Sequence, residues 1–549
     1  MRTAPQRAAL VGAVIAAIVT LPGLGIGTLW DNSETAYGEV AREVLLYHDA
    51  VVLHFNGAPW FIQPPLYFWL AALSAKLLGA GTLAMRLPSA LATIALAALT
   101  GYATCRVAGL RTACYATLIL STSVMQAIVG RLAIMDALLD LCVAAAIFGF
   151  FGSLQPEDWR LSIERRRTAA WYWAWVAMAF GVLAKGPVAV VIPAMVIVAW
   201  ILWEARDGRV LAFPGWRAWL GALLLFVAIT APWFALLQSR VGGVGIAELL
   251  WHYSFGRYVG TIEGQAGPVW YYLPALILGF FPWIAFLPAA FGRAVRDALN
   301  DRDAALVRLA LLWAVLPFLF FSFAQTKLPN YIALELPALA ILVALWFERV
   351  SLGEERRAAI VSGLVVPVAL GVVAGAVVSF SSHMQFTDAL AAIARDVRVL
   401  GIVMGAGALI AFLLLLRVSW AVRAPYALAA ATVTSLLLIA LVVEPQVEPF
   451  KPMPQIAAII ERERRPGDAV VIQSVAGANA LLFYTEPKIE MLPPPDDPQH
   501  ALCSAPRVFY VAPRDGATPE PSNGRTRRLI TVSGKDGLFL YEGTPCVTF

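Results

Sequence analysis

Thirteen stretches of this chain are apolar and long enough to cross a lipid bilayer, which takes about 20 residues of α-helix. Pro, Gly or charged residues separate them, as expected at the polar ends of membrane spans. The stretches cover residues 8–30, 87–105, 112–129, 137–154, 169–184, 187–203, 218–236, 268–291, 306–323, 331–347, 358–380, 399–416 and 424–444. The sequence therefore predicts a polytopic, all-α membrane protein with about 13 transmembrane helices.

The composition agrees with this fold class. Of the 549 residues, 60% are hydrophobic and 14% are charged, whereas soluble proteins have about half and about a quarter. The same values exclude disordered and collagen-like chains. The formal net charge of +5 is too small to predict binding to nucleic acid. The stretch 8–30 is too long for the core of a signal peptide and lacks a small-residue cleavage site, which favours a span.

Residues 65–80 are an ambiguous stretch, because counting them as a span changes the side of everything that follows. Basic residues in short loops mark the cytoplasmic side of a membrane protein. If residues 65–80 lie along the membrane surface, Arg2 and Arg7 fall on the same side as the later Arg-rich connections. We therefore predict an interfacial amphipathic helix at 65–80, a cytoplasmic N-terminus and a C-terminal segment outside.

The long connections all fall on the outer side. The predicted domains are a transmembrane domain, 1–444, and a periplasmic α/β domain, 445–549. Within the first domain, residues 31–86 form a first periplasmic loop with interfacial helices. The tail has one helix-like stretch, Met453–Arg464. Its strand-like runs are Ala469–Gln473, Arg507–Ala512, Leu529–Val532 and Leu538–Tyr541.

Cysteine and histidine usage gives one further expectation. Cys503 and Cys546 both fall in the outer tail, where an oxidising compartment permits a disulfide between them. No Cys or His spacing resembles a zinc site, and no metal ligands are predicted. A divalent metal is possible as a source of positive charge in the site, but it is not required if cationic side chains supply that charge.

Basic residues on the outer side run against the charge rule, so each of them calls for a reason. Lys185 and Lys327 lie in tight turns between spans, Arg257 belongs to an outer connection, and Arg131 precedes a span. Any one of them could be an interfacial charge whose aliphatic stem lies along apolar surface. Cations held rigidly at the outer edge of the membrane could also bind the phosphate of a lipid.

Acidic residues on the same side complete a possible reaction centre. They are Asp31 and Glu34, directly after the first span, and Asp136, directly before another span. Glu34 and Asp136 have a structural alternative, because Glu34 suits the first turn of a helix and Asp136 suits a helix start, but this does not explain Asp31. A carboxylate base beside a cationic phosphate site is what sugar transfer from a lipid phosphate requires.

Four groups of residues carry a resemblance to a known family. They are Ser33-Glu34-Thr35-Ala36-Tyr37 with Gln63-Pro64-Pro65-Leu66, Lys185-Gly186-Pro187, Trp270-Tyr271-Tyr272-Leu273-Pro274 with Phe281-Pro282-Trp283, and Thr326-Lys327-Leu328-Pro329-Asn330-Tyr331. In order and spacing they resemble bacterial membrane glycosyltransferases of the GT-C fold. The group in question is the protein O-mannosyltransferase-like one that includes the lipid A 4-amino-4-deoxy-L-arabinose transferases. The resemblance covers about residues 8–345.

The resemblance implies a donor sugar carried on polyprenyl phosphate and an acidic residue of the first outer loop near the reaction centre. It also implies a second acid at Asp136 and phosphate contacts from Arg257, Lys327 and Tyr331. The residues predicted to bind the donor phosphate or its lipid are Lys327, Tyr331, Arg257, Lys185, Arg131 and Gln63.

Two positions depart from the pattern of many relatives. Ser33 stands where they have Asp, and Gln63 stands where they have Lys. The first departure removes a favoured carboxylate, so the catalytic candidates are Glu34, Asp136 and Asp31. The second removes a cation from the expected phosphate site. Both leave the identities of the sugar and of the acceptor open.

The predicted function is transfer of a hexosyl or pentosyl group from a polyprenyl-phosphate carrier to a lipid or glycan, such as lipid A. The reaction is expected at the periplasmic face of the bacterial inner membrane, because nucleotide sugars are cytoplasmic and the loops there are short. One alternative is a transporter or flippase for lipid-linked sugars, for which Glu335 inside a span is the best residue. Another is a binding member of the same fold with altered catalysis, for which Ser33 and Gln63 are the reason.

Overall fold

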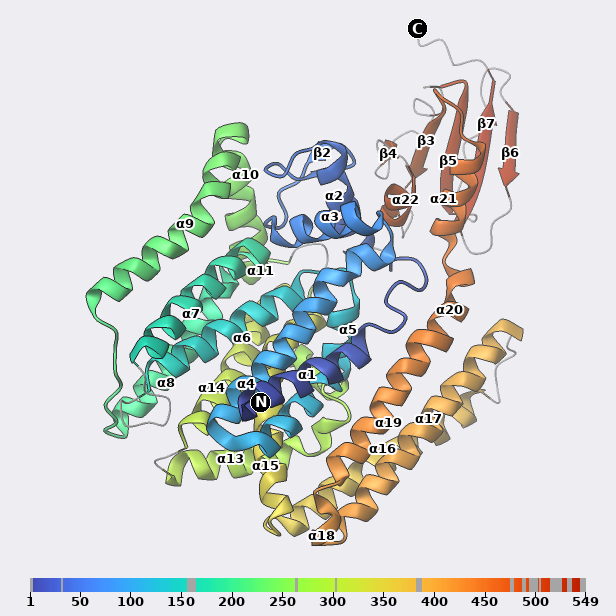
Figure 1. Cartoon of the computed structure of the whole chain (residues 1–549). Helices are drawn as coiled ribbons and strands as arrows, with labels where there is room; N and C mark the ends of the chain where they lie inside the picture. The colour runs from blue at the N-terminus through green and yellow to red at the C-terminus, as the bar shows by residue number, and fades with distance from the viewer. Residues whose placement is uncertain are drawn as a thin grey trace. The chain divides into compact units, whose positions relative to one another are not determined.

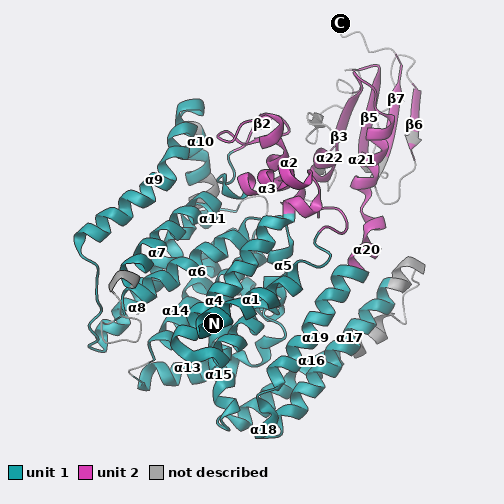
Figure 2. Cartoon of the chain, viewed as in Figure 1, with its two compact units in different colours: residues 1–24, 61–67, 86–442 teal, residues 25–60, 68–85, 443–549 magenta. Residues whose placement is uncertain are grey.

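The computed structural model of the chain describes residues 3–30, 33–155, 164–261, 265–301, 304–381, 388–473, 478–485, 490–492, 502, 505–513, 526–530 and 536–543. The chain divides into two compact units, which Figure 2 shows in different colours. The first, here called the helical unit, comprises residues 1–24, 61–67 and 86–442. The second, here called the mixed unit, comprises residues 25–60, 68–85 and 443–549.

Helices form the helical unit (Figure 1). Up to residue 260 they are α1 (Ala4–Thr20), most of α4 (Thr82–Ser121), α5 (Val124–Arg131), α6 (Asp136–Ser153), α7 (Glu164–Lys185), α8 (Val188–Arg206), α9 (Trp216–Val241), α10 (Gly243–Ala247), the π-helix η1 (Glu248–Phe255) and α11 (Gly256–Val259). They continue with η2 (Val269–Tyr271), α12 (Tyr272–Gly279), η3 (Trp283–Ala285), α13 (Leu287–Asn300), α14 (Ala305–Phe323), η4 (Pro329–Glu335), α15 (Leu336–Ser351), α16 (Arg356–Ser381), α17 (Asp388–Leu415), α18 (Val418–Ala421), α19 (Ala424–Leu438) and η5 (Ile439–Val443).

Eight helical segments of the described residues are long and apolar enough to cross a membrane. The prediction of a mainly helical, multi-span membrane protein is therefore confirmed, while the number 13 stays a prediction. The predicted spans 87–105 and 112–129 both begin within α4. Gly109 interrupts that helix, because its φ of 87° lies in a region that side chains rarely adopt. The stretch 65–80 contains α3, Leu66–Leu78, whose 13 residues are fewer than the about 20 that a span needs.

α6 packs against several other helices of the helical unit. It contacts α7, α8 and η4, and most of its residues are buried. Small residues allow the close approach, since a Cβ atom added at Gly149 would lie 2.9 Å from the Cβ atom of Ala174 on α7. Aromatic contacts complete the packing, with the rings of Phe148 and Trp313 at 5.3 Å. Dense packing of this kind fixes where α6 begins, which matters for the site below.

The mixed unit combines helices with a five-stranded sheet. Its helices are α2 (Ser33–Leu46), most of α3, α20 (Glu444–Val447), η6 (Glu448–Phe450), α21 (Pro452–Glu463) and α22 (Ala478–Tyr484), and β1 (His54–Phe55) pairs with β2 (Ala58–Pro59) as a short antiparallel hairpin. The sheet contains β3 (Ala469–Gln473), β4 (Glu490–Leu492), β5 (Arg507–Pro513), β6 (Thr526–Ile530) and β7 (Asp536–Glu542). Its order is β4-β3-β5-β7-β6, in which β3 is parallel to both neighbours and β7 is antiparallel to both.

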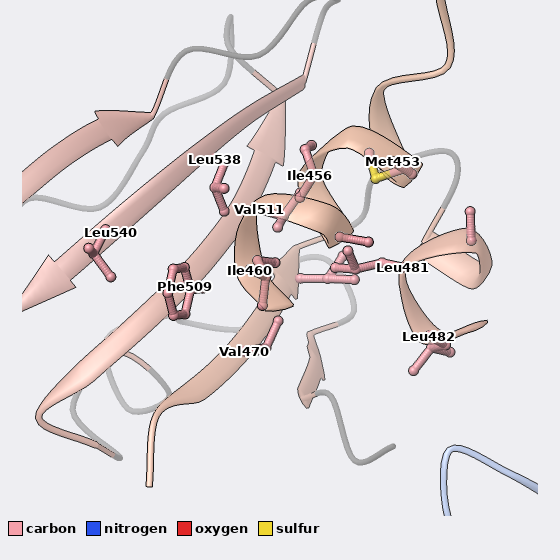
Figure 3. Close-up of a cluster of buried hydrophobic side chains, with 13 residues drawn as sticks. Met453, Ile456, Ile460, Val470, Leu481, Leu482, Phe509, Val511, Leu538 and Leu540 are labelled. Atoms are coloured by element: carbon pink, nitrogen blue, oxygen red, sulfur yellow. The ribbon is translucent and has the colours of Figure 1, made fainter. Parts of the chain in front are cut away.

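One face of this sheet is covered by helices. Ile456 and Ile460 of α21 are fully buried against Val470, Phe509 and Leu538 of the strands (Figure 3). The apolar residues of α21 recur at intervals of three and four, which places them on one side of that helix. β3 has the bounds predicted for it, and β6 begins three residues before the predicted run.

The mixed unit also contains residues 25–60, a grouping that the sequence does not reveal. The backbone N–H of Leu29 donates a hydrogen bond to the Tyr484 hydroxyl at 2.8 Å. A Cβ atom added at Gly38 of α2 would lie 2.9 Å from the ring of Phe483. Segments 25–60 and 443–549 therefore pack together, although the predicted domain limits, 1–444 and 445–549, separate them. Cys503 and Cys546 lie outside the described residues, so their predicted disulfide stays a prediction.

Candidate active site

A cavity of about 330 Å³ lies within the helical unit. Asp136 is the first residue of α6, Lys185 is the last residue of α7 and Pro187 precedes α8, so the cavity lies where these helices begin and end. Its polar lining consists of Gln63, Asp136, Lys185, Arg257, Tyr258, Thr326, Asn330 and Tyr331. Its apolar lining includes Ile62, Leu139, Val188, Val191, Phe320, Phe321 and Leu334.

Asp136 is the centre of a polar cluster in the cavity wall. Its Oδ1 atom accepts hydrogen bonds from Lys185 Nζ at 2.5 Å and from Asn330 Nδ2 at 2.7 Å. The side chains of Asp136 and Lys185 are 7% and 13% exposed, so solvent screens their attraction only weakly. Lys185 Nζ also lies 5.0 Å from the ring centroid of Tyr331, within the range of a cation–π interaction. These contacts hold the Lys185 cation at the cavity wall.

The local sequence explains the position of this ion pair. An acidic residue in the first turn of a helix and a basic residue in the last turn both interact favourably with the helix dipole. Asp136 begins α6 and Lys185 ends α7, so each is placed where its charge is favoured. Gly186 has a φ of 85° and directs the chain from α7 into α8. Because α6 and α7 pack closely, the two charges meet.

Arg257 supplies a second cation to the cavity from a different part of the chain. Its backbone carbonyl accepts a hydrogen bond from the N–H of Thr326 at 3.0 Å, and the carbonyl of Tyr258 accepts one from Gln325 at 3.0 Å. The hydroxyl of Thr326 donates to the carbonyl of Gly260 at 2.9 Å. These bonds fasten α11 and its following residues to the segment before η4. The lining thus contains two cations and one carboxylate, an arrangement that suits an anion.

Lys327 has different partners. Its Nζ atom donates to the carbonyl oxygens of Phe321, Ser322 and Ala324 at 3.3, 2.7 and 2.6 Å. The residue is 4% exposed, and burial lowers the pKa of its amino group. In this structure Lys327 satisfies the carbonyls at the end of α14, and it is not among the residues that line the cavity. Its predicted contact with a donor phosphate stays a prediction.

Arg131 plays a similar part at another helix end. Its Nη1 atom donates to the carbonyl oxygens of Val19, Thr20 and Pro22 at 3.3, 3.0 and 2.8 Å. These carbonyls lie at and just beyond the end of α1, where backbone acceptors have no helical partner. Arg131 is likewise not among the cavity-lining residues, and its predicted phosphate contact is untested.

The remaining candidates fall in both units. Gln63 and Tyr331 line the cavity, and their predicted contacts with the donor stay predictions. Glu34 belongs to the mixed unit, where it is 2% exposed and accepts a hydrogen bond from the N–H of Trp30 at 2.8 Å. Its place in the first turn of α2 matches the structural alternative considered for it. Asp31 lies outside the described residues. The catalytic roles of all three carboxylates remain predictions.

The sequence reasoning did not select Asn330 as a site residue, although it lies in the motif Thr326-Lys327-Leu328-Pro329-Asn330-Tyr331. A polar side chain at the start of a span, one residue before Tyr331, was the available signal. Among the described residues, no group of three or more His, Cys, Asp or Glu side chains could hold a metal ion.

Comparison with known proteins gives the class of fold first. The chain superposes on the crystal structure of ArnT from Cupriavidus metallidurans bound to undecaprenyl phosphate, with a TM-score of 0.78. The superposition covers 97% of both chains at 23% sequence identity. The apo form of the same protein gives a TM-score of 0.77 at 22% identity. The chain therefore has the fold of this membrane glycosyltransferase.

Sequence relatives agree with the fold. Residues 62–235 match the family described as dolichyl-phosphate-mannose-protein mannosyltransferase. The undecaprenyl phosphate-alpha-4-amino-4-deoxy-L-arabinose arabinosyl transferase of Edwardsiella ictaluri is 32% identical over 354 residues, which are 63% of this chain and 60% of the relative. That of Erwinia tasmaniensis is 30% identical over 374 residues, 67% and 64% of the two chains. The match thus spans less than two thirds of these relatives, and it confirms the predicted resemblance to GT-C membrane glycosyltransferases.

Proposed function

We propose that the chain is a membrane glycosyltransferase that moves a sugar from a polyprenyl-phosphate carrier to a lipid or glycan at the periplasmic face of the inner membrane. The observation that carries this proposal is the cavity that Lys185, Arg257 and Asp136 line together, with Lys185 paired to Asp136. A lysine and an arginine together offer the charge-assisted donors that bind phosphate. Membrane lipids are the expected surroundings, and no nucleic acid is a partner.

The lining of the cavity suits a lipid-linked donor. Val188, Val191 and Phe320 present apolar surface beside the two cations, as an isoprenoid chain attached to phosphate would require. The solved ArnT structure contains undecaprenyl phosphate, and the relatives are named for a 4-amino-4-deoxy-L-arabinose donor on that carrier. We infer a pentosyl donor of this kind and a glycolipid acceptor of the lipid A type.

The reaction needs a base as well as an anion site. The acceptor hydroxyl oxygen forms a bond to the anomeric carbon, while the bond from that carbon to the phosphate oxygen breaks. Its electron pair leaves on the polyprenyl phosphate, and the acceptor proton passes to a carboxylate. The candidates for this base are Glu34, Asp136 and Asp31. Of the candidates that the structure describes, Asp136 is the one that lines the cavity, and it accepts hydrogen bonds from Lys185 and Asn330. We assign Asp136 to orienting Lys185, and transfer assays on variants of each carboxylate would identify the base.

The proposed topology completes this assignment. Thirteen spans place the N-terminus in the cytoplasm and the tail, residues 445–549, in the periplasm as an α/β domain. Lys185, Asp136 and Arg257 are then all at the periplasmic ends of spans, where a lipid-linked sugar is available. Short cytoplasmic connections leave no room for a nucleotide-sugar domain on that side.

Transfer from a radiolabelled polyprenyl-phosphate sugar, measured with the full chain in lipid nanodiscs, tests the function. We expect Arg257→Gln to lower kcat/KM by about 10- to 100-fold, because one charge-assisted contact to phosphate is lost. Lys76→Gln, which removes an exposed cation from α3, is the matched control and should leave the rate unchanged. Measurable lipid movement by the wild type without transfer from any donor would favour a flippase. Undiminished transfer in Arg257→Gln would remove Arg257 from the site.

A further inference from the structure

A second groove, of about 390 Å³, lies in the helical unit among α4, α6, α7 and the start of α14. Its walls are mainly apolar, with Leu99, Ala145 and Phe148 among the lining residues. Trp173 and Tyr102 also line it and are 60% and 39% exposed, so the groove opens to the outside of the unit. For helices that cross a bilayer, an outward apolar groove is in contact with lipid.

This groove and the candidate active site lie at opposite ends of the same helices. On α7, Arg167 lines the groove and Lys185 lines the cavity, about 27 Å apart at the rise of an α-helix. On α6, Gly152 near the end lines the groove, whereas Asp136 at the start lines the cavity. Occupancy of the groove can therefore be tested separately from sugar transfer.

Two arginines mark the end of the groove that is farthest from the cavity. Arg106 donates from Nη1 to the hydroxyl of Tyr102 at 3.2 Å and lies 5.8 Å from the centroid of that ring. Arg167 donates to the carbonyl oxygens of Ser153 and Ala212 at 3.2 and 3.0 Å. Of the residues that the structure describes, no Asp or Glu lines the groove.

Gly152 shows that the groove has room along α6. A Cβ atom added at this glycine would meet no heavy atom within 4 Å, although Gly152 lies in a helix that is otherwise densely packed. Gly149, one turn earlier, differs from it, because its added Cβ atom would press against Ala174. The empty space at Gly152 is where a chain lying in the groove would pass.

We propose that this groove binds a phospholipid with an anionic headgroup, with its phosphate at Arg106 and Arg167 and an acyl chain along α4 and α6. Arginine binds phosphate oxygens through paired N–H donors, and basic pockets between spans are suited to anionic headgroups. Trp173 and Tyr102 are residues that favour the level of the headgroups. The two positive charges of Arg106 and Arg167 favour a headgroup with a net negative charge over a zwitterionic one. The proposal is independent of the proposed sugar transfer.

Native mass spectrometry of the full chain in detergent, titrated with phosphatidylglycerol or phosphatidylcholine, tests this site. The wild type should retain phosphatidylglycerol at lower concentration than phosphatidylcholine. Arg106→Gln should weaken the apparent Kd for phosphatidylglycerol by about fivefold and that for phosphatidylcholine by less, because the lost cation matters most for the headgroup with a net negative charge. Arg217→Gln is the matched control, because Arg217 also lies over an aromatic ring, that of Trp216 at 5.6 Å, but does not line the groove.

A second variant tests the acyl-chain part of the groove. Gly152→Leu should fill the empty space and weaken binding of both lipids, and leucine favours the helix more than glycine does. Gly405→Leu on α17 is its control, because an added Cβ atom there also meets nothing within 4 Å and Gly405 is outside the groove. Equal retention of the two lipids by the wild type would overturn the proposal. So would unchanged binding of phosphatidylglycerol in both Arg106→Gln and Gly152→Leu.

Discussion

A lysine stands at the end of α7 and another follows α14, and the two lysines have different surroundings. Lys185 pairs with the carboxylate of Asp136 and lines the cavity. Lys327 donates to three backbone carbonyls at the end of α14. One cation is held by a side chain at a cavity wall, and the other completes the hydrogen bonding of a helix.

This difference separates two uses of a buried cation. Carbonyl oxygens around a buried ammonium group replace the water that burial removes from it. Substituting such a lysine therefore lowers the stability of the protein. An ammonium group held by one carboxylate and an aromatic ring beside a cavity remains able to attract a second anion. The comparison therefore predicts that substituting the two lysines will affect different measurements.

The largest expected effect is on transfer by Lys185→Met. Its rate, measured per mole of folded protein in nanodiscs, should fall about 100-fold, because a charge-assisted contact to the donor phosphate and the neutralisation of Asp136 are both lost. Lys327→Met should stay within about threefold of the wild type by the same measure. Equal losses in the two variants would show that Lys327 also contacts the donor.

The next effect concerns stability. Lys327→Met should lower the free energy of unfolding by about 3 kcal/mol, because three carbonyls at the end of α14 lose their charged donor. Thermal unfolding in detergent, followed by tryptophan fluorescence, measures the loss. Lys76→Met serves as the control, since Lys76 is exposed on α3. An unchanged unfolding midpoint in Lys327→Met would contradict the role in helix capping.

A smaller effect is expected from Asn330, the second donor to Asp136. Asn330→Ala removes one of the two donors to Asp136 Oδ1, and Lys185 remains as the other. We expect transfer to fall about tenfold, in line with one hydrogen bond to a charged group. Asn330→Asp should be worse than Asn330→Ala, because it places a second carboxylate beside Asp136. An Asn330→Asp variant as active as Asn330→Ala would remove Asn330 from the polar cluster.

The smallest effect tests a third cation, the partly buried Arg42 of α2. Both oxygens of Glu39 bind Arg42, at 2.7 and 2.8 Å, while Glu43 accepts from the N–H of Gly57 at 3.1 Å. Burial, followed by the neighbouring Glu39, raises the pKa of Glu43 to about 7. Folded Glu43 then holds a proton that the unfolded chain releases, so its contribution to stability is complete below about pH 4.5 and is lost as the pH rises to about 7.

The measurement is the thermal midpoint of the mixed unit between pH 4.5 and 8, compared in the wild type and in Glu43→Gln. We expect the midpoint of the wild type to decline by a few degrees over this range relative to Glu43→Gln, which cannot lose a proton at this position. A parallel pH dependence in both proteins would show that Glu43 is ionised throughout. In that case Arg42 would neutralise both Glu39 and Glu43, whereas Lys185 pairs with Asp136.

Much of the fold follows from the sequence because apolar length is a local property. The strongly apolar stretches 137–154 and 306–323 coincide closely with α6 and α14. Between the predicted spans 87–105 and 112–129, α4 is interrupted at one residue, Gly109, which has a positive φ. The arginines between these spans do not predict this. The grouping of α2 with α22 depends on packing between segments far apart in the sequence, so no local pattern predicts it.

The sequence indicates which residues line the cavity better than it indicates what each of them contacts. Gln63, Asp136, Lys185, Arg257 and Tyr331 come from separate parts of the chain and all line one cavity. Asp136, Lys185 and Arg257 were selected by their charges on the predicted outer side, whereas Gln63 and Tyr331 were selected by the resemblance to known glycosyltransferases. Lys327 and Lys185 have similar local sequences, and only the tertiary partners, carbonyls for one and a carboxylate for the other, distinguish them. Asn330 was missed because an uncharged amide at a span start carries no electrostatic signal.

The discontinuous mixed unit has a consequence for the order of events during synthesis. Leu29 and Gly38 find their partners Tyr484 and Phe483 only after about 450 further residues have been made. At 5–20 residues per second, that interval is roughly 20 to 90 s. During this time the buried face of α2 has no α22 to cover it, while the helices of the helical unit are already available to one another. The helical unit can therefore assemble first. Residues 443–549 then complete the mixed unit, whose residues 25–60 were made much earlier.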